Sequence, residues 1–497
     1  MGEGVLDPIY TQQDLQRYRE KIQRCLDALA RMLAGDSFSA GPEQMGLELE
    51  LNLIDKNVDP AMANQTVLKQ INDPAFQTEL GQHNIEINVA PRPLAADEAL
   101  GLERELRAAL NTANDAARNT GVGLVMIGIL PTLRADHFDR RWMSPTSRYA
   151  LLNTQILAAR REELELNMEG VPLEGCLPER LRCAADSILP ESGCTSVQLH
   201  LQVAPRDFAA HWNAAQALAG VQVALAANSP FLLGRALWHE TRIPLFEQST
   251  DTRSPELRNQ GVRPRVWFGE RWITSIFDLF EENVTYFPAL LPVCEPEDPV
   301  EVLEHGGVPK LGELRLHNGT VYRWNRPIYD VVRGRPHLRV ENRVLPAGPT
   351  VVDTIANAAF YYGLVRVLAD EDRPLWSQMS FSAAEENFHA GARDGIDARV
   401  YWPGVGEVGA AELVVRRLLP MAHEGLDRWG VDAADRDRLC EIIERRCVEG
   451  RNGASWQAHT FHRLYERLDR EDALREMTVR YREHMHSNEP VHTWPLD

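Results

Sequence analysis

The stretch Gly46-Leu47-Glu48-Leu49-Glu50-Leu51-Asn52-Leu53 decides the fold, because leucines alternate with polar residues along its length. A side-chain period of two puts the leucines on one face of a strand and the carboxylates on the other. Such alternation predicts a β-strand with one buried face. Glu48 and Glu50 then project from the same face, where like charges repel unless water or a cation lies between them.

Three later segments repeat this alternation, and each predicts another strand with polar residues on its second face. The segments are 85–91, 197–203 and 338–344, and their polar faces carry Glu86, Gln198, His200, Glu341 and Arg343, with Glu79 shortly before the first. If the strands share one sheet, these faces converge on a single surface. Its oxygen donors suit Mg²⁺, and Arg343 would stabilise negative charge on a transferred phosphoryl group.

A second interpretation of the same pattern stays open. Glutamates that alternate along a strand are typical of the solvated outer face of an antiparallel sheet. For Glu48 and Glu50 alone, the solvated face is the better interpretation. The repetition of the pattern in four segments favours the metal site, but the pattern by itself does not decide between the two.

Helical periodicity separates these segments and dominates the end of the chain. Helices are predicted at 12–34, 97–119, 207–228 and from Thr350, whose hydroxyl and Asp353 resemble a capping box. A further apolar strand is predicted at 123–130. Beyond about residue 365 the patterns are helical, at 410–419, 434–448 and 456–485. The predicted fold is α+β: a mostly antiparallel sheet with helices on one side, followed by a helical C-terminal subdomain over 366–497.

Composition narrows the function classes. The 497 residues carry a formal net charge of −19, which argues against a nucleic-acid binder but not against anionic substrates held by local arginines or metal ions. The sequence has no stretch of 18 or more apolar residues, so no membrane span is predicted. The N-terminus lacks the features of a signal peptide. Seven cysteines without CxxC spacing indicate neither a zinc knuckle nor a redox dithiol. We therefore expect a reduced, cytoplasmic protein.

Five segments, taken in order, resemble the glutamate–cysteine ligase family. They are the G-x-E-x-E strand at 46–50, the segment 79–86 with acidic residues at both ends, the strand 194–201 with Thr-Ser-Val-Gln-Leu-His at 195–200, the Ala-Asn-Ser-Pro segment at 227–230, and the E-x-R strand within 339–343. Each motif is weak alone. Their shared order over roughly residues 45 to 370 carries the resemblance.

The resemblance implies a glutamine-synthetase-like catalytic sheet in a ligase domain over 1–365. Members of the family use ATP with Mg²⁺ to phosphorylate the γ-carboxyl of glutamate, and the amine of cysteine then attacks the acyl phosphate. By motif matching, the metal ligands are Glu48, Glu50, Glu79, Glu86, His200 and Glu341. The resemblance also implies that Glu341 and Arg343 are the catalytic residues, and that substrate is bound by Gln198, Arg148 and Arg242.

Alternatives remain at several points. The segment 312–349 does not follow the family pattern closely, so the amine, and even the acid, stays open. Arg148 and Arg242 are interpreted equally well as members of surface salt bridges. A non-catalytic protein that binds a metal, a nucleotide or an amino acid is the second functional hypothesis. The complete acidic set together with Arg343 favours the enzyme.

One motif is rejected as a nucleotide site. Residues 404–409 form a literal G-x-G-x-x-G. A dinucleotide fold also needs a βαβ unit with an acidic residue after the next strand, whereas only helical patterns follow residue 410. We expect a turn that leads into a helix.

Overall fold

The structure is a computed structural model that describes residues 10–35, 37–38, 43–173 and 175–496. Its centre is an antiparallel sheet in the strand order β12-β13-β7-β1-β3-β2, with β4 paired to the end of β1. The strands are β1 Gln44–Ile54, β2 Phe76–Thr78, β3 Asn84–Pro93, β4 Gly123–Val125, β7 Ser196–Gln202, β12 Asn325–Val332 and β13 Arg335–Pro346. The four predicted alternating segments are neighbours in this sheet, which confirms the α+β fold.

Four small two-stranded sheets lie outside the central one. They are β5 Leu164–Glu169 with β6 Arg180–Ala185, β8 Phe231–Leu232 with β9 Arg235–Ala236, β10 Val266–Trp267 with β11 Tyr322–Arg323, and β14 Arg399–Trp402 with β15 Gly406–Gly409. Among them only β10 and β11 run parallel, within the described residues.

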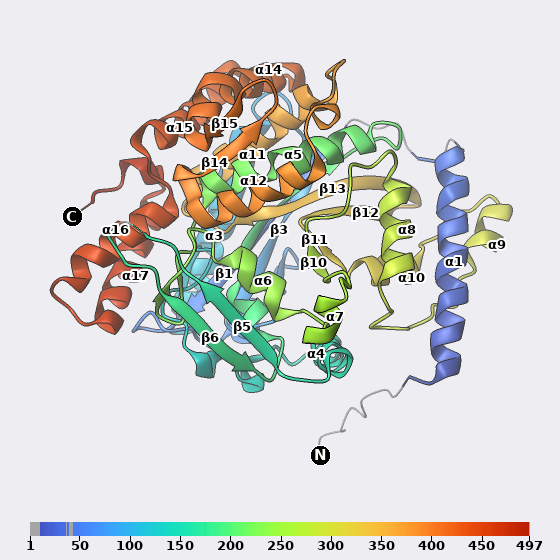
Figure 1. The fold of residues 1–497 in the computed structure, drawn as a ribbon, viewed down its shortest axis with the longest axis horizontal. Helices are drawn as coiled ribbons and strands as arrows, with labels where there is room; N and C mark the ends of the chain where they lie inside the picture. The colour runs from blue at the N-terminus through green and yellow to red at the C-terminus, as the bar shows by residue number, and fades with distance from the viewer. Residues whose placement is uncertain (1–9, 36, 39–42, 174, 497) are drawn as a thin grey trace.

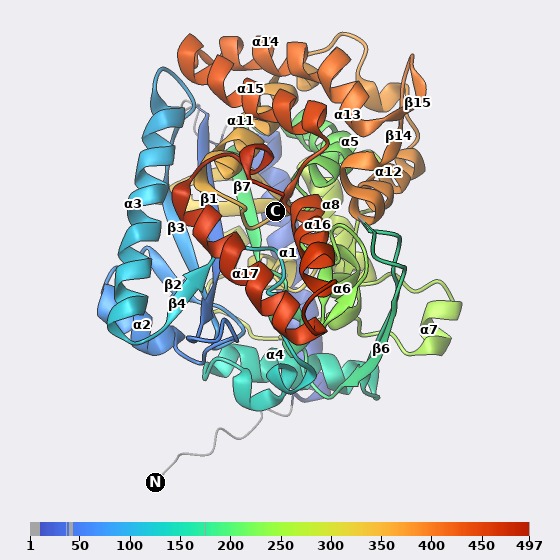
Figure 2. The ribbon, with the colours of Figure 1, turned by 90° about the vertical axis from the view of Figure 1, so that its left-hand side faces the viewer.

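Helices lie on both sides of the sheet, whereas the sequence predicted them on one side only. Their bounds are α1 Gln12–Ala34, α2 Asn64–Ile71, α3 Glu98–Asn119, α4 Ser147–Arg160, α5 Phe208–Ala226, α6 Arg242–Ser249, α7 Pro255–Asn259, α8 Ile276–Tyr286, α9 Pro299–Glu304, α10 Gly312–Asn318, α11 Val351–Ala369, α12 Phe381–Asp394, α13 Ala410–Leu413, α14 Leu419–Trp429, α15 Ala433–Glu449, α16 Gly453–Tyr465 and α17 Arg470–Ser487. Figure 1 shows α5, α11, α12, α14 and α15 above the sheet, and β5, β6 and α4 below it. In Figure 2, α3 runs beside β3.

Two central helices, α5 and α11, bury nearly all of their surface. They pack against β13 and β7, respectively, and against each other. By length and composition α11 resembles a membrane span, but 94% of that window is buried inside the protein. Like α5, it therefore serves as a core helix, covered on its outer side by α14 and α15.

Helices predicted from their periodicity and their N-terminal caps are confirmed. The predicted helix 12–34 matches α1, which begins after the N-cap Thr11 with a full capping box. The hydroxyl of Thr350 accepts a hydrogen bond from the N–H of Asp353, as expected at the start of α11.

Three local predictions are corrected. The strand predicted at 123–130 ends at Val125, since side chains bind the next two carbonyls: Tyr481 donates to Met126, and Thr195 donates to Ile127. The helical run 456–485 is two helices, α16 and α17. Residues 404–409 form the turn and second strand of the hairpin β14–β15, not a turn directly into a helix.

The predicted domain boundary at residue 365 falls inside α11, which continues to Ala369. The helices beyond it pack on α11 and α5, and one continuous hydrophobic core extends from Tyr18 to Trp494. The C-terminal helices are therefore packed onto the same core as the sheet.

Candidate active site

The polar faces of four adjacent strands meet on one surface of the sheet. Glu50 of β1 pairs with Glu86 of β3, and Glu341 of β13 pairs with His200 of β7. Glu48 lies opposite Gln198 of β7. Because side chains alternate along each strand, these pairings bring the predicted residues together on the face opposite α5 and α11.

A first group of carboxylates consists of Glu50, Glu79 and Glu86. Their oxygen atoms lie within 4.8 Å of one another. Burial, with the nearby Glu86, raises the pKa of Glu50 to about 7. Burial, with Glu50 and Glu86, also raises the pKa of Glu79 well above its usual value. The raised pKa values show that the protein does little to relieve the repulsion between these carboxylates. Three oxygen donors in this arrangement suit a divalent cation such as Mg²⁺.

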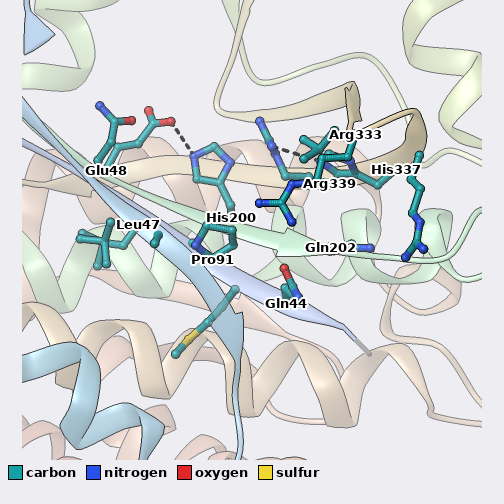
Figure 3. Close-up of a pocket in the computed structure, with 16 residues that line it drawn as sticks. Gln44, Leu47, Glu48, Pro91, His200, Gln202, Arg333, His337 and Arg339 are labelled. Atoms are coloured by element: carbon teal, nitrogen blue, oxygen red, sulfur yellow. Dashed lines mark hydrogen bonds and ion pairs between the residues drawn. The ribbon is translucent and has the colours of Figure 1, made fainter. Parts of the chain in front are cut away.

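A second group consists of Glu48, His200 and Glu341. Nε2 of His200 lies 3.0 Å from Oε1 of Glu48, and a dashed line marks this contact in Figure 3. Burial opposes ionisation of Glu48, but the contact with His200 outweighs it and lowers the pKa of Glu48. Glu341 is 1% exposed. Despite this burial, Arg326 and Arg343 hold its pKa far below the usual value.

Arg343 links the two groups. Its Nη1 donates to Oε1 of Gln198 at 2.5 Å and also contacts Glu341. The amide of Gln198 in turn donates to Oε1 of Glu50 at 3.0 Å, and the N–H of Ser196 donates to Oε2 of Glu50 at 2.7 Å. The face is thus one connected network of carboxylates, an amide and a guanidinium.

Two cavities open beside this network. The larger, of about 870 Å³, lies at the end of β1 and β7 and is lined by Glu48 and His200. Figure 3 shows Arg333 and Arg339 on its opposite side. The smaller cavity, of about 460 Å³, is lined by Arg148 together with Arg315, Arg326 and Arg339. Both cavities are therefore locally cationic although the whole chain is acidic.

The sequence model of a family described as glutamate–cysteine ligase family 2 (GCS2) matches residues 44–478. The chain belongs to glutamate–cysteine ligase family 2. This membership confirms the resemblance drawn from the five motifs and assigns the chain to the carboxylate–amine ligases. No individual curated protein matches it by sequence.

Solved structures extend the family assignment to the fold. A glutamate–cysteine ligase from Francisella tularensis, solved in complex with AMP, superposes with a TM-score of 0.55 at 12% identity, over 93% of this chain and 91% of that one. A bifunctional glutathione synthetase from Pasteurella multocida aligns at 11% identity with a TM-score of 0.47, over 93% of this chain and 55% of that one. The first likeness confirms the predicted fold.

Within this family fold, two residues that the motifs did not single out join the site. Arg326 forms a two-pronged pair with Glu341, with Nε and Nη2 each 2.9 Å from a carboxylate oxygen. A tight turn at Arg333-Gly334, both with positive φ, sets this register. Arg-Gly is not one of the usual hairpin dipeptides, so only the structure places Arg326 opposite Glu341.

Glu191 is the second missed residue. It lies in a short 3₁₀ helix, Leu189–Gly193, just before β7. Burial raises its pKa to about 7, with Arg343 opposing that shift, and its charge raises the pKa of Glu79 and Tyr149. No periodic signal marks it, because it reaches the site from a turn and not from a strand.

The two arginines predicted to bind substrate lie in different surroundings. Arg148 lines the smaller cavity, where it is available to a ligand. Arg242 lies in the interior with its side chain 2% exposed, and its Nε donates to Glu240 at 3.2 Å. We therefore retain Arg148 as a substrate-binding candidate and assign Arg242 to the support of the site.

Proposed function

We propose that this member of glutamate–cysteine ligase family 2 is an ATP- and Mg²⁺-dependent carboxylate–amine ligase that forms a γ-glutamyl amide through an acyl phosphate. The observation that carries the proposal is the paired carboxylate groups, joined by Arg343 and Gln198, beside two arginine-lined cavities. Phosphoryl transfer to a carboxylate gathers several negative oxygens in one place, and this surface is built to receive them.

Both carboxylate groups would hold magnesium: Glu50, Glu79 and Glu86 on one side, and Glu48, His200 and Glu341 on the other. When bound, Mg²⁺ would neutralise phosphate oxygens and polarise the transferred phosphorus centre. His200 would serve as a ligand in its neutral form, through a ring nitrogen. The raised pKa of Glu50 implies that this group releases protons as the ion enters.

Arg343 would stabilise the transferred phosphoryl group. Its guanidinium is held from behind by Gln198 and Glu341, so it is oriented before substrate arrives, and little reorganisation is needed in the transition state. Arg326 completes the charge balance of Glu341. This pairing keeps the carboxylate of Glu341 ionised and ready to act as a metal ligand.

The two cavities suggest where each substrate binds. The larger one, with Glu48 on one side and Arg333 and Arg339 on the other, suits a nucleotide whose phosphates approach the metal ligands. The AMP complex of the Francisella tularensis ligase supports a nucleotide site on this fold. The smaller cavity, with Arg148, suits the carboxylates of an amino acid such as glutamate. Cysteine is the amine we propose first, and another amine is the alternative.

Turnover of the purified protein tests the proposal. We expect ADP release that requires Mg²⁺, ATP, glutamate and an amine, with cysteine the first of a panel of amines. An acid-dependent ADP release that responds to a different amine would keep the ligase and change the substrate. Binding of ATP or glutamate without any amine-dependent turnover would instead favour the non-catalytic binding protein.

A substitution at Glu341 tests the assignment of the site. Glu341→Gln keeps the size of the side chain but removes the charge that balances Arg326 and Arg343. We expect kcat to fall by about 100-fold or more, the scale of losing one preorganised electrostatic contact. The matched control is Glu165→Gln on β5. This strand glutamate lies outside the site and pairs with Arg182 at 2.9 Å, so its substitution should leave kcat unchanged. Full activity of Glu341→Gln would refute the assignment.

We propose that the protein is cytoplasmic. Burial raises the pKa of the thiols of Cys25, Cys440 and Cys447 to about 12. Thiols of this kind are unreactive and are compatible with the cytoplasm that we infer from cysteine usage.

A further inference from the structure

β13 contains a β-bulge where it passes the candidate active site. The register against β7 shifts between Asn342 and Leu345, so Arg343 and Val344 together occupy the place opposite the single residue Gln198. A bulge bends its strand and changes the direction of a side chain, and bulges are frequent beside active sites. Here one of the two bulged residues is the arginine proposed to act on the phosphoryl group.

The backbone of the bulge is held by an interior arginine. Nη2 of Arg242 donates to the carbonyl oxygen of Val344, and Nη1 lies 3.5 Å from the carbonyl oxygen of Arg343. The N–H of Arg343 donates to the carbonyl oxygen of Trp324 at 2.8 Å. A buried carbonyl without a partner costs free energy comparable to a lost hydrogen bond. Arg242 therefore stabilises this conformation of the bulge.

Arg242 is itself fixed by a buried frame. Its Nε donates to Oε1 of Glu240 at 3.2 Å, and its N–H donates to Oγ of Ser229 at 3.2 Å. Glu240 accepts from the hydroxyl of Ser229 at 2.5 Å and from the N–H of Asn228 at 2.8 Å. All four residues are buried. The Asn-Ser pair of the Ala-Asn-Ser-Pro segment thus supports the guanidinium that holds β13.

We propose that Arg242 is a positioning residue: it fixes the bulge of β13 and thereby aims Arg343 at Gln198 and Glu341. The inference rests on the proposed function, in which Arg343 stabilises the transferred phosphoryl group. It also gives Arg242 a role without substrate contact, in agreement with its enclosure by Glu240 and the two carbonyls.

Arg242→Lys separates this role from general stability. Lysine keeps a positive charge opposite Glu240, but its single ammonium cannot reproduce the planar fork that reaches Glu240 and two carbonyls together. We expect kcat to fall by about 100-fold, the effect of misplacing a catalytic group by about 1 Å. The KM values for the acid and the amine should stay close to those of the wild type. A raised KM with kcat recovered at saturating substrate would overturn the inference in favour of substrate binding.

A double-mutant cycle asks whether the effect passes through Arg343. In an Arg343→Ala background the group to be aimed is absent, so we expect Arg242→Lys to lower kcat by less than about threefold. Independent effects would multiply in the cycle. A full further loss of about 100-fold in that background would therefore overturn the inference.

Arg446→Lys is the matched control. Nη2 of Arg446 lies 2.8 Å from Oδ1 of Asp353, and this pair is as buried as that of Arg242 but joins α15 to α11. We expect a lower melting temperature with kcat per folded molecule unchanged. Equal losses of kcat in Arg446→Lys and Arg242→Lys would show a purely structural role and overturn the inference. If Arg242→Lys does not fold, Glu240→Gln replaces it, with the same kinetic pattern expected.

A crystal structure of Arg242→Lys provides a readout that does not depend on turnover. We expect the guanidinium of Arg343 to leave its contact with Gln198, and an unmoved Arg343 would overturn the inference. Failure of the wild type to release ADP with any acid and amine would instead reject the proposed function. The two failures are thus distinguished.

Discussion

Glu50, Glu79 and Glu86 show, at the scale of single residues, what the proposed cation site costs in stability. Arg343 and Gln198 reach Glu50, but the set as a whole is left with raised pKa values. The second group differs, because Arg326 and Arg343 compensate Glu341 fully and lower its pKa. One group therefore needs the ion more than the other.

The pH dependence of stability follows from the first group. The pKa of Glu50 is about 7 in the folded protein and near its usual value, about 4.3, in the unfolded chain. Between these values the folded protein holds a proton that the unfolded chain has released, so metal-free stability falls as pH rises through this window. Mg²⁺ should reverse the trend, because it replaces the protons.

Thermal melts at pH 5.5 and pH 8, with Mg²⁺ and with a chelator, measure this effect. We expect the rise in melting temperature caused by Mg²⁺ to be larger at pH 8. In Glu50→Gln both the fall with pH and the gain from Mg²⁺ should shrink. A Mg²⁺ effect of equal size at both pH values would contradict the assignment of these carboxylates as ligands.

At the scale of elements, two helix crossings depend on glycine. A Cβ added at Gly425 of α14 would lie 1.8 Å from the carbonyl oxygen of Gly363 in α11. In the same way, a Cβ at Gly391 of α12 would lie 2.2 Å from the carbonyl oxygen of Gly220 in α5. The backbones of each pair of helices are therefore in direct contact. A residue larger than glycine at these positions would prevent α14 from approaching α11, and α12 from approaching α5, so closely.

Gly425→Ala tests the crossing of α11 and α14. We expect a loss of at least about 1–3 kcal/mol of unfolding free energy, since the added methyl must push two backbones apart. Gly101→Ala in α3 is the matched control, because its Cβ would meet only ordinary contacts at 3.6 Å from Arg92 and Glu98. There alanine should stabilise the helix by about 1 kcal/mol. Chemical denaturation measures both, and a neutral Gly425→Ala would contradict the crossing.

At the scale of the whole molecule, the C-terminal helices complete the core of the sheet domain. Arg446 of α15 pairs with Asp353 of α11 and also donates to Asn357 at 2.6 Å. Asn452, before α16, donates to the carbonyl of Ala224 at the end of α5 at 3.0 Å. The candidate active site is on one face of the sheet and α5 and α11 are on the other, so the helices that pack on α5 and α11 contribute by holding them in place.

A chain that ends at residue 369 should therefore fail to fold. It would expose the apolar surfaces of α11 and α5 that α12, α14 and α15 now cover, and apolar patches of that kind drive aggregation. Solubility and circular dichroism measure the outcome. As a control, fragments 1–404 and 405–497 divide the chain at the exposed turn of the hairpin β14–β15, and we expect them to reassemble when co-expressed. A soluble, native-like 1–369 fragment would restore the domain boundary predicted at 365.

The sequence by itself determined the local structure and the chemical character of the site. The alternation around Glu48 and Glu50, and in the later segments, predicted strands with one polar face, because the side-chain period of a strand is a local property. The order of the motifs then identified the family. The helix at 12–34 followed from its period and from a cap that needs only neighbouring residues.

Only the tertiary structure decided which strands are neighbours, where the bulge lies and which arginine faces solvent. Glu191 reaches the carboxylates from a turn, and Arg242 turns inward to hold β13. The boundary predicted at 365 falls within α11, because the pattern of a buried helix carries no sign of what covers it. These features depend on contacts between residues far apart in the chain, which single-segment patterns do not encode.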